Sequence, residues 1–353
     1  MKAMIYSGPG KLAPGDIEEP VLQEPSDAIV RVTIGSICTS DLHIRAGAVP
    51  RAVPGIAVGH EFVGVVESVG SDVSHIKVGD RVAVNCETYC GECYFCRHGW
   101  VNNCTDSNGG WALGCRIDGG QAEKARIPFA DNCLTPIPDG VSDEAALLTG
   151  DLLSTGYWAA DIGDIAEGDT VAVVGAGPTG ICCAMMAHAM GAGKIAIIDV
   201  DRSRLDFCRK NGYGDAFIDS SSEDADAIIK EMTEGRGADV VLEVAGGKDS
   251  LRTAWTIARP NAVIVIVAMY EENQVLPLPE MYGKNLTFKT GGVDGCHCTE
   301  IMRMISEGRI DATPLITHRF PFSRIEEAYD LFSERRDGVM KIAVTMGRRC
   351  SGV

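Results

Sequence analysis

No stretch of about 18 consecutive apolar residues, the length that a membrane-spanning helix requires, occurs in the sequence. The first ten residues, MKAMIYSGPG, carry a charge but no long apolar core, so they do not resemble a secretion signal. The composition, 45% hydrophobic and 23% charged over 353 residues, is typical of a soluble globular protein. We therefore expect a cytoplasmic protein with no membrane partner and with enough residues for two domains.

Basic side chains are scarce relative to acidic ones. The chain has 32 Lys and Arg against 49 Asp and Glu, a formal net charge of −17. A protein that binds nucleic acid normally presents a basic face to the phosphate backbone. The charge balance therefore predicts that nucleic acid is not a partner.

Cysteine is too sparse for a disulfide scaffold, at 14 residues in 353, and a chain without a secretion signal is expected in a reducing compartment. Four cysteines nevertheless cluster in YCGECYFCRHGWVNNC, at Cys90, Cys93, Cys96 and Cys104. Four thiolates on one loop can close a tetrahedral zinc site that leaves no position for substrate. We therefore predict a structural zinc here rather than the active site. Other cysteines are interpreted as core or surface residues: Cys115, Cys133, Cys182, Cys183, Cys208 and Cys350.

The organisation of the chain changes near its middle. Up to about residue 150, short apolar runs such as Ala28–Ile34, Val63–Val69 and Arg81–Val84 alternate with turn residues, which predicts a β-rich region. From about residue 153, apolar strands alternate with helices, in the order TVAVVGAGPTG, ICCAMMAHAMGAG, KIAIIDV and RSRLDFCRKNGYG. This alternation predicts a parallel sheet covered on both faces. After about residue 290 we expect a helix at Cys298–Glu307, another within FPFSRIEEAYDLF, a strand KIAVTM and a frayed tail GRRCSGV.

A glycine-rich turn follows the first strand of the second region and opens a helix. It reads Gly175, Ala, Gly177, Pro178, Thr179 and Gly180. In this context the first glycine permits the tight turn, the second lets the backbone approach a pyrophosphate, and the third lets the helix pack on the sheet. The phosphates would lie at the helix N-terminus, where N–H groups and the helix dipole favour anions.

Asp199 lies nineteen residues beyond Gly180, at the end of the next strand. A carboxylate there accepts hydrogen bonds from ribose hydroxyls and repels a 2′-phosphate, which predicts NAD rather than NADP as the cofactor. A strand or helix cap is the alternative interpretation of this aspartate. Arg202 and Arg204 follow closely, and either could meet a phosphate group.

A catalytic zinc needs three protein ligands and one open position, and the remaining candidates lie in three separate segments. Cys38, His60 and Asp151 would supply sulfur, nitrogen and oxygen ligands. Each also has an ordinary interpretation as a core thiol, a buried histidine or a helix-capping aspartate. Composition and spacing alone do not bring the three together.

The segment GHEFVGVVESVGSDV fits the pattern G-H-E-x-x-G-x5-G-x2-V of zinc-containing dehydrogenases. With CTSDLH before it and the cysteine cluster and glycine turn after it, residues 1–346 resemble the medium-chain zinc-dependent alcohol dehydrogenases. The resemblance implies an α/β protein: a GroES-like β-barrel catalytic domain plus a Rossmann domain with a doubly wound parallel sheet. The catalytic domain would comprise residues 1–152, with a zinc lobe at about 86–106, and residues 293–353. The Rossmann domain would comprise residues 153–292.

The resemblance also implies roles for individual residues, with two zinc ions per chain. Cys38, His60 and Asp151 would bind the catalytic zinc, and an aspartate at the third position is similar to the microbial secondary-alcohol dehydrogenases. The same segment, GDLLSTGYW, is similar to glutathione-independent formaldehyde dehydrogenases. Further roles are a nearby acid (Glu61), an orienting partner for the histidine (Asp41), a proton relay (Ser40 and His43), a nicotinamide contact (Thr155) and a pyrophosphate contact (Lys341). One departure is Thr39, where liver-type enzymes carry a basic residue.

The sequence thus predicts an NAD-dependent zinc oxidoreductase that acts on small alcohols, most simply a secondary alcohol and its ketone. Polyol, threonine and formaldehyde dehydrogenases on the same scaffold remain alternatives, because substrate pockets vary while the fold does not. A non-catalytic nucleotide-binding protein is a more distant alternative. The branch that the sequence resembles is usually homotetrameric, and a homodimer is the other expected assembly.

Overall fold

The computed structural model describes residues 1–347, so Cys350 and all but the first residue of GRRCSGV lie outside the described residues. The chain forms two compact units. The first unit comprises residues 1–154 together with the residues from 294 onward, and the second comprises residues 155–293. The domain boundaries predicted after residues 152 and 292 differ from these divisions by two residues and one residue.

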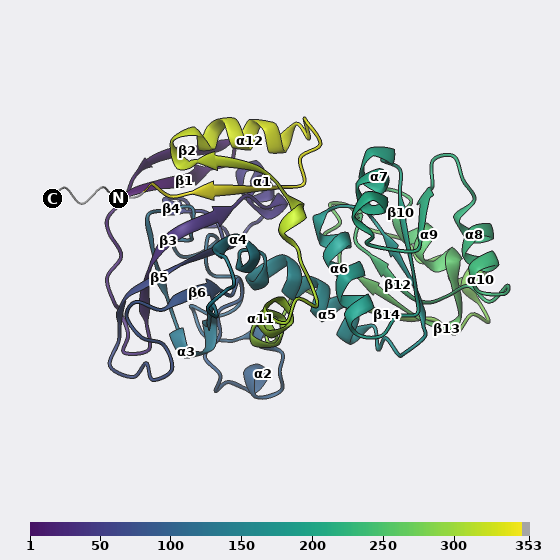
Figure 1. The fold of residues 1–353 in the computed structure, drawn as a ribbon, viewed down its shortest axis with the longest axis horizontal. Helices are drawn as coiled ribbons and strands as arrows, with labels where there is room; N and C mark the ends of the chain where they lie inside the picture. The colour runs from purple at the N-terminus through teal and green to yellow at the C-terminus, as the bar shows by residue number, and fades with distance from the viewer. Residues whose placement is uncertain (348–353) are drawn as a thin grey trace. The chain divides into compact units, whose positions relative to one another are not determined.

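The first unit is built mainly from strands, and both the purple start and the yellow end of the chain contribute to it (Figure 1). Its strands are β1 (Lys2–Gly8), β2 (Lys11–Asp16), β3 (Ala28–Ser36), β4 (Ile56–Ala57), β5 (Phe62–Val69), β6 (Arg81–Val84), β7 (Lys124–Ile127), β8 (Leu134–Pro136), β15 (Ile316–Pro321) and β16 (Lys341–Thr345). Its α-helices are α1 (Thr39–Ala46), α2 (Tyr94–Arg97), α3 (Ala130–Cys133), α4 (Asp143–Ala146), α11 (Cys298–Ser306) and α12 (Ile325–Ser333). Tighter or wider helical turns are η1 (Val101–Asn103), η2 (Thr149–Leu153), η3 (Thr313–Leu315) and η4 (Phe322–Arg324).

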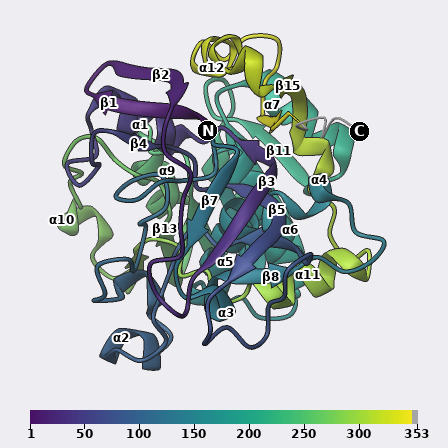
Figure 2. The same ribbon diagram turned by 90° about the vertical axis from the view of Figure 1, so that its left-hand side faces the viewer.

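A seven-stranded sheet organises the first unit. Its path is β15-β16-β3-β5-β6-β8, with β7 also paired to β3, and a smaller sheet has the order β2-β1-β4. The inner faces of β3, β5 and β6 are apolar, and burying them creates the core of the barrel. The late strand β16 pairs antiparallel with β3, so residues from opposite ends of the chain form one sheet. Figure 2 shows β3, β5 and β7 from the side, with α12 near the β1–β2 hairpin that it contacts.

The second unit is an α/β structure that surrounds one parallel sheet. Its strands are β9 (Thr170–Val174), β10 (Lys194–Asp199), β11 (Ala216–Asp219), β12 (Ala238–Glu243), β13 (Ala258–Ile266) and β14 (Thr287–Thr290). Its helices are α5 (Ser154–Ile162), α6 (Pro178–Ala189), α7 (Arg202–Asn211), α8 (Ala225–Met232), α9 (Ser250–Ile257) and α10 (Leu278–Met281). All five residues of β9 are buried, as expected for a central strand covered on both faces.

The strand order β11-β10-β9-β12-β13-β14 places the first strand of the unit in the middle of the sheet. The order therefore reverses between β9 and β12, and ligands of such sheets bind beyond the carboxyl ends of the strands at the reversal. The glycine turn that starts at Gly175 follows β9, and Asp199 ends β10, so both occupy this edge. The predicted parallel sheet is confirmed.

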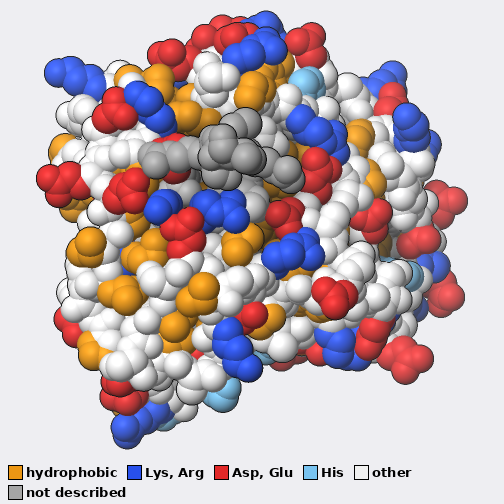
Figure 3. Space-filling view, turned by 60° about the vertical axis from the view of Figure 1, so that its left-hand side comes forward, with side chains coloured by type: hydrophobic (Ala, Val, Ile, Leu, Met, Phe, Trp, Pro, Cys, Tyr) orange, Lys and Arg blue, Asp and Glu red, His pale blue; other side chains and the backbone are white. Residues whose placement is uncertain are grey.

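None of the described helices is both long enough and apolar enough to cross a bilayer. On the described part of the face in Figure 3, Lys and Arg side chains are interspersed with Asp and Glu rather than gathered into one basic patch. This distribution agrees with the excess of acidic residues in the sequence.

Candidate metal centre and dinucleotide site

The first ligand candidate, Cys38, lies at the N-cap of α1, immediately after β3. Helix α1 begins there because the Asp41 carboxylate accepts a hydrogen bond from the Cys38 N–H at 2.9 Å, which satisfies a backbone donor at the helix start. Ser40 and His43 follow at a spacing of three residues and therefore share one side of the helix. The Cys38 sulfur lies 3.7 Å from the Ser40 hydroxyl.

His60 is 4% exposed and lies just before β5. Its Nδ1 atom faces the Asp41 carboxylate at 3.7 Å, and Asp41 is in turn held by the Gln121 side-chain amide at 3.0 Å. The Tyr329 hydroxyl donates to the Gln121 side-chain oxygen at 2.8 Å, so a buried chain of polar contacts fixes the aspartate. This places Asp41 where it can orient the ring of His60, with the opposite nitrogen directed away from it.

Asp151 lies in η2, one turn of π-helix that packs against the end of β6. The η2 backbone approaches the end of β6 closely at Gly150, which has no side chain. A Cβ there would lie 1.8 Å from the Val84 carbonyl oxygen. The Cys86 N–H donates to the Gly150 carbonyl at 3.0 Å and joins the two segments. Single turns of π-helix occur frequently at functional sites, where they redirect a side chain that a regular helix would place elsewhere.

Three side chains from these separate segments converge on one point. The Asp151 Oδ2 atom is 3.5 Å from His60 Nε2 and 3.7 Å from Cys38 Sγ, and all three ligand atoms lie within 4.8 Å of one another. Ligand atoms on a tetrahedral zinc are separated by about 3.4–3.8 Å, given the usual zinc–ligand distances. The residues present therefore fit a zinc ion held by one sulfur, one nitrogen and one oxygen.

The electrostatics of the three groups also favour a cation. Burial alone would lower the pKa of His60, but Asp151 and Cys38 raise it well above its ordinary value. Burial alone would raise the pKa of Asp151, but His60 holds it below its ordinary value. Asp151 thus carries negative charge that stabilises a cation where the three ligand atoms meet, whereas burial, followed by Glu61, raises the pKa of the Cys38 thiol.

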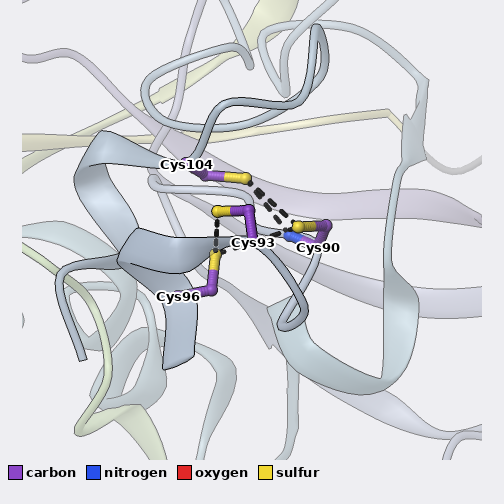
Figure 4. A group of neighbouring side chains, drawn as sticks. All are labelled: Cys90, Cys93, Cys96 and Cys104. Atoms are coloured by element: carbon purple, nitrogen blue, oxygen red, sulfur yellow. Dashed lines mark hydrogen bonds between the residues drawn. The ribbon is translucent and has the colours of Figure 1, made fainter. Parts of the chain in front are cut away.

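The four clustered cysteines come together on a loop of the first unit. Figure 4 shows their side chains converging around α2, with sulfur–sulfur separations of 3.4 Å for Cys93–Cys96, 3.6 Å for Cys90–Cys104 and 3.9 Å for Cys90–Cys96. These separations fit a closed tetrahedral zinc site. Backbone hydrogen bonds from Cys96 and Thr105 lower the pKa of the Cys93 thiol to about 5, whereas burial raises the pKa of Cys96 and of Cys104.

Lys341 makes buried contacts within the first unit. Its side chain is 2% exposed, and its ammonium forms an ion pair with Glu61 and donates to the Ile37 carbonyl at 3.0 Å. Burial alone would lower the pKa of Lys341, but Glu61 raises it, so the ammonium remains charged. The described contacts of Lys341 are thus with Glu61 and Ile37, beside the candidate ligand His60, and its pyrophosphate contact stays a prediction. The ion pair has a physical reason, since an unpaired carboxylate at Glu61 would be costly to bury.

Sequence reasoning missed Cys86 and Glu87, which lie beside the candidate metal centre. The Cys86 sulfur is 3.7 Å from Asp151 Oδ1, and burial, followed by Asp151, raises the pKa of this thiol well above its ordinary value. Glu87 is 8% exposed, and burial raises its pKa to about 8, while Arg51 opposes the shift. The ring of Trp111 contacts His60 edge to face, with centroids 5.5 Å apart. A cysteine and a glutamate directly after a buried strand were the only sequence signals for the first two.

In the second unit, α6 begins with Gly177 at its N-cap and Pro178 and Thr179 in its first turn. Gly177 has no side chain to cap the helix, so the first N–H groups can bind an anion. The start of the helix approaches the glycine turn closely because Gly180 has no side chain. A Cβ at this position would lie 1.9 Å from the Gly175 carbonyl oxygen. The close packing agrees with the role expected of Gly180, and the approach of a pyrophosphate to Gly177 stays a prediction.

Asp199 is tied to the glycine turn by its carboxylate. Its Oδ2 atom accepts from the Ala176 N–H at 2.6 Å and its Oδ1 atom accepts from the Asp201 N–H at 2.9 Å. The Arg204 Nη1 atom lies 3.6 Å from the position of a Cβ on Gly177. The structure thus brings Asp199 and Arg204 to the turn, whereas Thr155 lies in the first turn of α5 and its nicotinamide contact stays a prediction.

A split barrel with two sets of zinc-ligand geometry, joined in sequence to a Rossmann sheet, defines a zinc-binding dehydrogenase. Two family models match the chain: the alcohol dehydrogenase GroES-like domain over residues 24–139 and the zinc-binding dehydrogenase domain over residues 178–306. An alcohol dehydrogenase of Cupriavidus necator is 34% identical, and the alignment covers 98% of each chain. The NADP-dependent isopropanol dehydrogenase of Thermoanaerobacter brockii is 31% identical over 98% of this chain and 100% of its own.

Among solved structures, the alcohol dehydrogenase TADH from Thermus sp. ATN1 matches with a TM-score of 0.90 and 32% identity. That match covers 98% of this chain and 100% of the Thermus chain. The chain therefore belongs to the medium-chain zinc-dependent alcohol dehydrogenase family and is an oxidoreductase of that family. The family and the fold class inferred from the sequence are both confirmed.

Proposed function

We propose that the protein is an NAD-dependent zinc alcohol dehydrogenase that interconverts a small secondary alcohol and its ketone. The observation that carries the proposal is the convergence of Cys38, His60 and Asp151, whose ligand atoms lie within 4.8 Å of one another. Three ligands from three segments leave a fourth position of a tetrahedral ion for substrate. The four-cysteine loop has four ligands of its own, so we assign it a structural zinc.

The chain's own residues supply orientation and proton transfer. A zinc ion held by the three ligands would act as a Lewis acid that polarises the oxygen of the alcohol or ketone. Asp41 orients His60, and the Lys341–Glu61 ion pair balances buried charge next to it. The Ser40 hydroxyl, 3.7 Å from the Cys38 sulfur, is positioned to accept the proton that the alcohol loses. His43, on the same side of α1, is suited to pass that proton to water.

The glycine turn and Asp199 support a dinucleotide at the carboxyl edge of the second unit. Phosphate oxygens would meet the free N–H groups at the start of α6, with Arg204 beside Gly177 as a counter-charge. A carboxylate at Asp199 favours the ribose hydroxyls of NAD over the 2′-phosphate of NADP. The Thermoanaerobacter relative is NADP-dependent, so the cofactor preference needs its own test.

Replacing Asp199 with glycine should shift the cofactor preference. We expect the ratio of kcat/KM for NADP to that for NAD to rise by about tenfold or more, because a repulsive charge near the 2′-phosphate is removed. The KM for NAD should also rise, since the carboxylate that holds the Ala176 N–H is lost. Initial rates with each cofactor measure both effects. Asp206→Asn, an exposed position on α7, is the matched control, and an unchanged ratio would contradict the ribose role.

A substrate panel tests the proposed reaction directly. Initial rates of NAD reduction would be measured with 2-propanol, 2,3-butanediol, ethanol, sorbitol, threonine and formaldehyde, and each would be repeated with NADP. We expect the dominant rate with 2-propanol and NAD. A dominant rate with formaldehyde or threonine would replace the secondary-alcohol proposal while retaining the reaction class.

A polyol or diol dehydrogenase is the second candidate, and Glu87 is the observation that favours it. Its carboxylate is buried, interacts electrostatically with Asp151 and His60, and has an Oε2 atom without a hydrogen-bond partner. A second hydroxyl on the substrate is a natural partner for such a group. In the panel, faster turnover of 2,3-butanediol than of 2-propanol would favour this candidate.

Assembly and location complete the proposal. We propose a cytoplasmic homotetramer, with a homodimer as the alternative. Support for self-association comes from apolar side chains exposed near the end of the second unit's sheet, namely Met269, Val275, Leu278 and Tyr282. Sedimentation velocity of the purified protein distinguishes the two assemblies from a monomer.

A further inference from the structure

Asp151 is a carboxylate with two different environments. Its Oδ2 atom faces the ring of His60 and the sulfur of Cys38, while its Oδ1 atom lies 3.7 Å from the sulfur of Cys86. Cys86 does not belong to the group of ligand atoms that lie within 4.8 Å of one another. The thiol therefore lies beside the carboxylate without being part of the ligand set.

The backbone around Cys86 fixes this contact. Cys86 follows β6 directly, and its N–H donates to the Gly150 carbonyl at 3.0 Å, one residue before Asp151. The same two segments approach closely, because Gly150 has no side chain and a Cβ there would lie 1.8 Å from the Val84 carbonyl oxygen. Cys86 is only 3% exposed, so packing restricts the position of its sulfur relative to the carboxylate.

We propose that Cys86 is a positioning residue for the metal ligand Asp151. Its S–H group donates to Oδ1, so that the carboxylate presents Oδ2 alone to the zinc ion. A carboxylate held in this way would bind a zinc ion through one oxygen and would leave a position for substrate. The inference rests on the proposed role of Asp151 as a zinc ligand.

Three variants of Cys86 and one control variant separate the effect of hydrogen bonding from that of packing. Cys86→Ser keeps a donor of similar size, whereas Cys86→Ala removes the donor and Cys86→Val fills the space without one. Cys133→Ala is the matched control, because Cys133 is also buried in the first unit but contacts the Tyr89 N–H instead. Should Cys86→Ala fail to fold, Cys86→Val gives the same comparison.

The measurements do not depend on turnover. Zinc affinity would be measured by competition with a chromogenic chelator, and the coordination geometry by the visible absorption of protein with cobalt at the catalytic site. Loss of a group that orients a metal ligand typically weakens metal binding by about 10–100-fold. We expect that loss, together with an altered cobalt spectrum, in Cys86→Ala and Cys86→Val, and near wild-type behaviour in Cys86→Ser and Cys133→Ala.

Three outcomes would overturn the inference. Wild-type affinity and cobalt spectrum in Cys86→Val would show that the donor is not needed. Equal losses in Cys86→Ser and Cys86→Val would assign the effect to packing. If wild-type protein and Asp151→Ala bound equal amounts of zinc, the ligand assignment itself would fail, and that result is distinguishable because it involves no change at Cys86.

Discussion

Replacing Asp151 with alanine is expected to abolish turnover and to lower kcat/KM by at least about a thousandfold. The zinc ion would lose one of its three protein ligands, and the transition state would lose several kcal/mol of stabilisation. The substitution also leaves His60 without the carboxylate that contacts its Nε2 atom at 3.5 Å. Binding of NAD should change by no more than about threefold, since the glycine turn and Asp199 lie in the other unit. Steady-state kinetics, zinc analysis and NAD titration measure the three quantities.

Two further variants make this result specific. Asp151→Cys replaces the carboxylate with a thiolate, another zinc ligand, and should retain more zinc and more activity than Asp151→Ala. Asp72→Ala, on an exposed turn, should behave as the wild-type protein does. Full zinc content with normal turnover in Asp151→Ala would refute the ligand assignment.

The second large effect is expected on stability. Replacing Cys104 with serine should remove the structural zinc and lower the Tm by at least about 10 °C, because the free energy of metal binding is also folding free energy for the loop. Two large side chains of the loop contribute little apolar burial, since Tyr94 and Trp100 are 63% and 51% exposed. Differential scanning calorimetry and zinc analysis, which should fall from two ions to one per chain, check the expectation.

Cys296→Ser provides the matched control for this experiment. Its sulfur lies near the same loop, 3.4 Å from the Gly99 carbonyl oxygen, but it is not one of the four clustered thiols. We expect unchanged zinc content and a Tm close to that of the wild-type protein. If Cys104→Ser kept two zinc ions per chain, the assignment of the four-cysteine site would be wrong.

Local features of the sequence were sufficient for much of this structure. The Rossmann sheet could be predicted because buried strands and helices alternate with a glycine turn in the expected order, from β9 to β13. The cysteine cluster could be predicted because its four ligands lie within fifteen residues of one another. In both cases the residues that interact are close in sequence, so spacing carries the information.

Contacts between distant segments could not be derived in that way. Cys38, His60 and Asp151 were grouped only through resemblance to a family, because no spacing rule links three residues on separate segments. The Lys341–Glu61 ion pair was not predicted, since its residues are separated by 280 positions. Cys86 gave no signal at all: a buried cysteine after a strand is ordinary until the fold places Asp151 next to it.

The insertion of β16 between β3 and β15 has a consequence for the order in which the protein is made. The Lys341 ammonium meets the Ile37 carbonyl, which the ribosome produced 304 residues earlier. All six strands of the second unit are synthesised in between, so that sheet can close first. Until β16 emerges, the Glu61 carboxylate lacks its counter-ion and residues 34–36 at the end of β3 lack their β16 partners. The nascent chain therefore carries a short unpaired stretch of sheet edge beside the candidate metal ligands until its last strand is added, and such edges are prone to pair with other chains.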